Sequence, residues 1–178
     1  MNQYLLDKIS AASLNKTEMR ELADGCKDLP EQDYTEMLQY LLSIYDGPGV
    51  TNLLTISAIN KIKLDPETFV KSIMMCDDRP VVLSCSDYQT EDVVTYLLDY
   101  GYKWHGGASN KTVTAFYIAI DLIKKHKLDE EKRKIIDLIN FMHFNSEDPE
   151  AIADFIFLKQ CATSTLDLKK SNILNKLP

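Results

Sequence analysis

Apolar residues recur at spacings of three and four along most of this chain, and this period restricts the possible folds more than any other feature. In residues 93–101, VVTYLLDYG, the pairs Val93-Val94 and Leu97-Leu98 fall on one helical face. Such spacing is typical of amphipathic helices, whereas the strict alternation that indicates half-buried strands hardly occurs. The sequence therefore predicts an all-α fold.

Start and stop signals divide the chain into a series of short helices. Asp65 is suited to cap a helix that Pro66 opens. Thr90 is suited to cap another, which Gly101 ends in a left-handed C-cap. The stretch Asp46-Gly47-Pro48-Gly49 is expected to interrupt the helices on either side of it. Helices are predicted at about 2–12, 15–26, 31–45, 51–62, 66–75, 80–85, 90–100, 114–125, 129–142 (capped by Asp129) and 149–161 (capped by Asp148), with a last short one ending near 174.

Each predicted helix carries one apolar face, and these faces are expected to form the core. Small residues among them are expected to let neighbouring helices approach closely. The apolar faces comprise Tyr4, Leu5, Ile9, Ala12; Tyr34, Met37, Leu38, Leu41, Leu42, Tyr45; Phe69, Val70, Ile73, Met74; Val81, Val82, Leu83, Cys85; Val93, Val94, Leu97, Leu98; Ile135, Ile136, Leu138, Ile139, Met142; and Ala151, Ile152, Phe155, Ile156, Cys161. The small residues are Ser57, Ala58, Ser84, Cys85 and Ala119.

One stretch has the order of features found in a known repeat. Residues 79–104 hold Pro80-Val81, a small pair at Ser84-Cys85, a turn, the two apolar pairs of residues 93–98, and Gly101. This order resembles an ankyrin repeat, with Tyr88 where that family prefers glycine. Looser matches occur at 52–58 and at 114–120, where Tyr117 stands in place of the family's histidine.

The resemblance implies a helical-repeat solenoid of stacked helix pairs. Residues 50–144 would form the ankyrin-like repeats, with helical caps at 1–46 and 146–178. The chain is then a single helical domain spanning residues 1–178.

The charge is negative overall and unevenly distributed. The net charge is -7, and residues 1–103 hold 9 Lys/Arg against 17 Asp/Glu, whereas residues 104–178 hold 11 against 10. This balance argues against direct nucleic-acid binding, which needs cations for the phosphates. An acidic half could steer a partner with a basic surface, although the ordinary explanation of such a charge is solubility alone.

The chain has no apolar run long enough to span a membrane, so no membrane contact is expected. The four cysteines form no C-x-x-C pair, which favours plain core positions and a reducing, cytoplasmic compartment. If the chain comes from a virus or is a bacterial effector, that compartment would be the host cytosol.

Residues that carry chemistry are present but scattered. His105, His126 and His143 lie on separate segments with no acidic partner at motif spacing, and no G-x-S-x-G occurs. The carboxylates at 77–78 and 87–92 lie where turns and helix starts favour them, and the mixed-charge stretch 124–134 is expected to be a solvated entry to a helix. No cofactor, no metal and no enzymatic activity are therefore predicted.

Under the ankyrin interpretation, the turn after residue 101 is the candidate binding surface. Exposed aromatic side chains on a rigid turn bring a large contact area at a small entropy cost. The alternative is that Trp104 packs over the end of the stack. The predicted protein-binding residues are Tyr88, Gln89, Tyr102, Lys103, Trp104, His105, Asn110 and Lys111.

Three functional hypotheses follow. The first is a non-enzymatic adaptor or inhibitor that binds a partner protein through repeat turns and inner helices. The second is an acidic immunity or anti-defence protein that masks a basic nuclease or nucleic-acid-binding partner. The third is a helical enzyme, which no feature of the sequence supports. The sequence does not indicate the oligomeric state.

Overall fold

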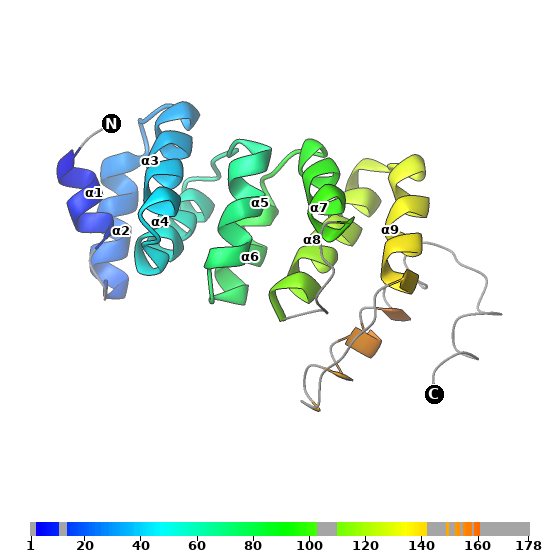
Figure 1. Cartoon of the computed structure of the whole chain (residues 1–178). Coiled ribbons are helices and arrows are strands. Elements are labelled where there is room, and N and C mark those ends of the chain that lie inside the picture. Colours follow the sequence, from blue (N-terminus) through cyan, green and yellow to red (C-terminus); the bar gives the residue numbers. More distant parts are fainter. Residues whose placement is uncertain are drawn as a thin grey trace. The chain divides into compact units, whose positions relative to one another are not determined.

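Figure 1 shows the computed structural model, in which every regular element among the described residues is a helix. The all-α prediction is therefore confirmed for this part of the chain. The contacts group the chain into two compact units, Met1–Val93 and Val94–Pro178. The structure describes residues 3–10, 14–102, 110–141, 149, 152–153, 155–157 and 159–160.

The first unit contains six of the described helices, and their boundaries agree with those predicted to within about three residues except at the start of α4, which begins four residues earlier than predicted. α7 (Asp92–Tyr102) crosses the division between the units, and α8 (Asn110–His126) packs on α9 (Asp129–Phe141) in the second unit. The helices of the first unit are α1 (Gln3–Ile9), α2 (Lys16–Cys26), α3 (Glu31–Ser43), α4 (Gly47–Ile59), α5 (Pro66–Met75) and α6 (Arg79–Ser86).

Helices of the first unit contact one another in a regular order. α4 contacts α2 and α6, and α3 contacts both α4 and α5 (Figure 1). α4 also contacts α1 and α5. α3, α4 and α5 thus each pack on a sequence neighbour and on a helix two positions away along the chain.

Aspartate caps begin three consecutive helices of this unit. Asp46, Asp65 and Asp78 each accept a hydrogen bond from the backbone N–H three residues later, at 3.0, 2.9 and 3.1 Å. In each case a proline lies at the first or second helical position. The prediction for Asp65 is confirmed. The prediction that residues 46–49 interrupt the helices is wrong in part, because Gly47-Pro48-Gly49 is the first turn of α4; proline fits there, where its missing N–H has no helical partner.

Three helix C-termini share a second device, a non-glycine residue in the left-handed conformation. Tyr45, Lys61 and Lys127 have φ of 57°, 56° and 56°. The N–H of the residue that follows each of them bonds back to a carbonyl five positions earlier, at 3.0, 2.9 and 3.1 Å. This geometry is a Schellman motif, for which glycine is the residue of lowest strain.

Three predicted helix ends are placed differently in the structure. α7 continues through Gly101 to Tyr102, so Gly101 is not a C-cap. α7 begins at Asp92 rather than directly after Thr90, and Asp129 is the first residue of α9 rather than its cap. Glycine permits a left-handed helix end but does not require one. A helix start also does not require a side-chain cap: at the start of α7 the Val93 N–H bonds to the Thr90 backbone carbonyl, at 3.3 Å.

The buried residues follow the predicted faces closely, with several corrections. Tyr4 is 64% exposed because the buried face of α1 is centred on Leu6 and Ile9. Tyr45 is 85% exposed because α3 ends before it and the helical period no longer applies. Ile152 and Ser84 are also exposed. The predictions for Ala12, Met142, Asp148, Ala151 and Cys161, and for the last helix, fall outside the described residues.

Candidate functional site

The structure describes some of the predicted binding residues, and the others fall outside the described residues. Tyr88 is half-buried in the turn after α6, and Lys111 is half-buried in the first turn of α8. Tyr102 ends α7 and Asn110 begins α8. Lys103, Trp104 and His105, together with His143 and Gly106-Gly107, fall outside the described residues. The turn between α7 and α8 therefore stays a predicted site.

Gln89 is a correction to the predicted site, because its side chain is not available to a partner. It is 3% exposed. Its Oε1 accepts from the Leu64 N–H at 2.9 Å, and its Nε2 donates to the carbonyls of Ile62 and Cys85 at 3.1 and 3.0 Å. Because these bonds pair the Leu64 N–H and the Ile62 carbonyl and also reach the Cys85 carbonyl, Gln89 holds the α4–α5 connection against the end of α6.

A second buried network joins three helix ends on the other side of α4. Asn60 Nδ2 donates to the Ala23 carbonyl and to the Tyr34 hydroxyl, each at 2.8 Å. The fully buried Tyr34 hydroxyl in turn donates to the Cys26 carbonyl at 2.8 Å. These bonds satisfy carbonyls that the C-terminal turn of α2 leaves without helical partners. The end of α4 is thereby fixed to α2 and α3.

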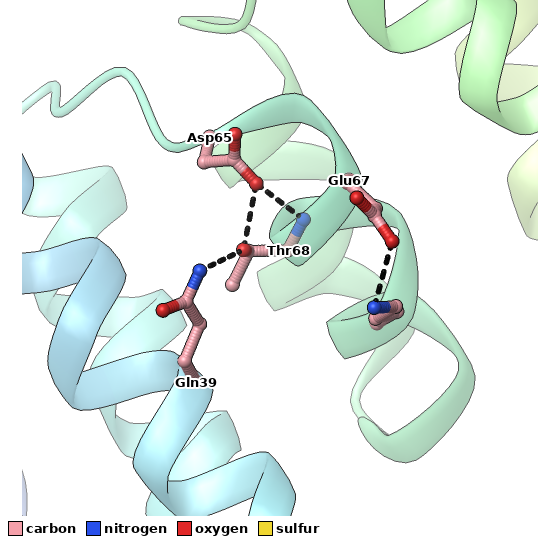
Figure 2. A network of polar contacts seen from close by, with 5 residues as sticks. Gln39, Asp65, Glu67 and Thr68 are labelled. Atoms are coloured by element: carbon pink, nitrogen blue, oxygen red, sulfur yellow. Dashed lines mark hydrogen bonds and ion pairs between the residues drawn. The ribbon is translucent and has the colours of Figure 1, made fainter.

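A third network connects α3 with α5, as Figure 2 shows. Asp65 Oδ2 accepts from both the N–H and the hydroxyl of Thr68, at 2.9 and 2.7 Å, and Gln39 Nε2 donates to the same hydroxyl at 3.0 Å. Glu67, on the outer side of α5, pairs with Lys71 at 2.8 Å. The polar residues between these helices are thus used for docking one helix on the next.

The end of α3 carries the group of exposed apolar residues that sequence analysis missed. Tyr40, Ile44 and Tyr45 are 36%, 50% and 85% exposed. We call these three residues the α3 terminal patch. Tyr40 and Ile44 lie four apart, and thus on one helical face. Tyr40 and Ile44 lie outside the buried stripe of Tyr34, Leu38 and Leu41. This separation is the sequence signal that could have identified Tyr40 and Ile44.

The three cysteines in the described part of the chain are buried and free, as predicted. Burial raises the pKa of the Cys26 thiol, and raises that of Cys85 to about 12 with a smaller contribution from Cys76. Thiols that hold their protons so firmly are poor nucleophiles. Cys76 lies 3.3 Å from the Thr51 hydroxyl, a contact that joins α4 to the end of α5.

Within the described ranges, no three His, Cys, Asp or Glu side chains lie close enough together to hold a metal ion. Nor does any helix in those ranges combine the length and apolar character needed to cross a membrane. Comparison with family models, with curated proteins and with solved structures finds no match to this chain.

Proposed function

We propose that this chain is a non-enzymatic helical-repeat protein whose stacked helix pairs present a surface to another protein. The observation that carries the proposal is the order of helix contacts in the first unit, α2 with α4 and α4 with α6, beside α3 with α5. In repeat proteins each pair contacts its neighbours in this way, and the stack presents an extended surface for binding.

The three polar networks support the same proposal. Gln89, Asn60 and Gln39 each join the end or face of one helix to the next pair along the chain. Such bonds fix each pair on its neighbour, so that a partner meets a rigid surface and the entropy cost of binding is small. The ankyrin resemblance of residues 79–104 belongs to this proposal, with adaptor or inhibitor as the role it implies.

Affinity purification with the immobilised full chain tests the proposed function. We expect a specific protein to be retained and to bind the purified chain directly in calorimetry. The double variant Tyr102→Ala, Trp104→Ala should weaken that binding with little change in melting temperature. A large fall in melting temperature instead would place these residues in the core, and absence of any directly binding protein would contradict the function itself.

The uneven charge favours one second candidate, an acidic protein that masks a basic nuclease or nucleic-acid-binding partner. Its support is the excess of 17 acidic over 9 basic residues in positions 1–103. Electrostatically steered association slows steeply as salt rises, because screening shortens the reach of the charges. An association rate that does not change between low and high salt would contradict this candidate.

A further inference from the structure

The α3 terminal patch combines three properties that are unusual for a protein surface without a role. Tyr45 is the most exposed of the large apolar side chains in the described residues, and it occupies a left-handed backbone position. Both features oppose stability, since glycine would be less strained there and a polar side chain better solvated. Strain retained at an exposed aromatic residue is typical of a functional site.

The third property is the charge of the segment that carries the patch. Residues 28–60, which include all of α3 and α4, contain no Lys, Arg or His. The same stretch holds five carboxylates: Asp28, Glu31, Asp33, Glu36 and Asp46. The first three lie before or at the start of α3, away from the patch, and Asp46 caps α4, so Glu36 is the exposed carboxylate in line with the patch. The nearest cation on the adjoining helix α5, Lys71, is paired with Glu67 at 2.8 Å.

Acidic and apolar residues share one line along α3. Glu36, Tyr40 and Ile44 follow one another at intervals of four, and all three are exposed. Gln32 continues the line and donates to Glu36 at 3.2 Å. Residues four apart on a helix are neighbours on its surface. The line therefore presents a carboxylate beside an aromatic ring and an aliphatic side chain.

We propose that the α3 terminal patch is the docking site for a cationic, apolar segment of a partner protein. Lys or Arg of that segment would pair with Glu36 and lie over the faces of Tyr40 and Tyr45, while an aliphatic side chain covers Ile44. This inference rests on the proposed function and names the partner class. The absence of basic residues from 28–60 opposes an anionic membrane or a nucleic acid, and the net charge of -7 opposes a second copy of this chain, because each would bring like charges together.

The chain offers a matched pair of double variants for the test. Tyr45→Gly with Ile44→Ser alters the patch. Lys61→Gly with Ile59→Ser alters the end of α4, where Ile59 is 48% exposed and Lys61 has the same left-handed conformation. Because each pair relieves one strained residue, we expect both to keep or raise the melting temperature.

The probe is a short synthetic peptide of lysine and leucine in amphipathic helical order, titrated into the full chain and followed by NMR. Its controls are the same peptide with glutamate for lysine, and a lysine–serine peptide of equal charge. We expect shift changes centred on residues 36–46, and an affinity at least about tenfold lower for the Tyr45/Ile44 variant but nearly unchanged for the Lys61/Ile59 variant.

Several results would overturn the inference. Equal binding by the two variants would remove the patch as the site, and equal binding of the lysine–serine peptide would remove its apolar component. Self-association or binding to phosphatidylserine vesicles that the Tyr45/Ile44 substitutions abolish would identify a different occupant. If the purified natural partner binds both variants alike, the inference fails while the proposed function stands; if no natural partner exists, the function fails and the peptide titration still decides the site.

Discussion

At the scale of single residues, two helical glycines differ in the space available for a side chain. A Cβ atom on Gly49 would collide with the Asp46 carboxylate and lie 2.8 Å from Leu41 Cδ2, whereas a Cβ on Gly25 would meet nothing within 4 Å. Gly49 is therefore required for the Asp46 cap and for the close approach of α3 to α4. Gly25 only weakens α2.

The substitutions Gly49→Ala and Gly25→Ala are expected to act in opposite directions. Gly49→Ala should lower the free energy of unfolding by roughly 1–3 kcal/mol, because the cap and Leu41 must shift. Gly25→Ala should raise it by up to about 1 kcal/mol through helix propensity. Urea denaturation of the two variants measures both effects. The same sign for both would show that packing at Gly49 does not control its effect.

The buried thiol of Cys85 gives the folded chain a defined response to alkaline pH. Burial raises the Cys85 pKa from 9.0 to about 12, so the folded chain holds this proton more tightly than the unfolded chain does. The stabilising contribution is complete below about pH 9 and is lost as the pH rises toward 12. Denaturation midpoints measured between pH 8 and 11 should fall with pH, and less steeply in Cys85→Ala than in wild type. Equal slopes would contradict a buried, protonated thiol at this position.

At the scale of elements, the sequence predicted the helices better than their ends. The apolar period identified the helices α1 to α9, and Asp65 was recognised as a cap because its side chain and Pro66 act locally. Gly101 and the 46–49 stretch were misjudged because each residue type there is compatible with both a helix and a break. Tertiary contacts decide between these outcomes.

The candidate site was harder to predict than the fold. Gln89 was taken for a surface residue because glutamine is usually exposed, whereas its partners, Ile62 and Leu64, lie far away in sequence and only the folded chain brings them near. Tyr45 was assigned to the core because the period was extended two residues beyond the end of α3. Both errors arose because the burial of these residues depends on contacts that are not local in the sequence.

The Gln89 network should contribute strongly to the stability of the α4–α5 connection. Gln89→Ala leaves the Leu64 N–H and the Ile62 carbonyl without these bonds, and is expected to lower the free energy of unfolding by about 2–3 kcal/mol. Gln39→Ala is the matched control: Gln39 is exposed and donates once, to Thr68, so a loss of about 1 kcal/mol or less is expected. Equal losses in thermal or urea denaturation would contradict the role given to Gln89.

At the scale of the whole molecule, the proposed helical-repeat architecture requires that helix pairs follow one another along the first unit. α4 lies in contact with α2 and with α6 (Figure 1). Packed helices have axes about 8–10 Å apart, so in the proposed stack two steps would place α2 and α6 about 16–20 Å apart. Helices gathered around one shared centre would instead bring α2 and α6 to nearly the same separation as α2 and α4.

Pulsed electron spin resonance measures this difference directly. Spin labels would be attached through Glu21→Cys on α2 and Ser84→Cys on α6, both exposed positions, with Glu21→Cys and Ile59→Cys on α4 as the one-step control. The buried native thiols react slowly, and Cys161→Ser removes the fourth. The account predicts that the α2–α6 distance exceeds the α2–α4 distance by about 8–10 Å. Equal distances for the two pairs would contradict a stack of helix pairs.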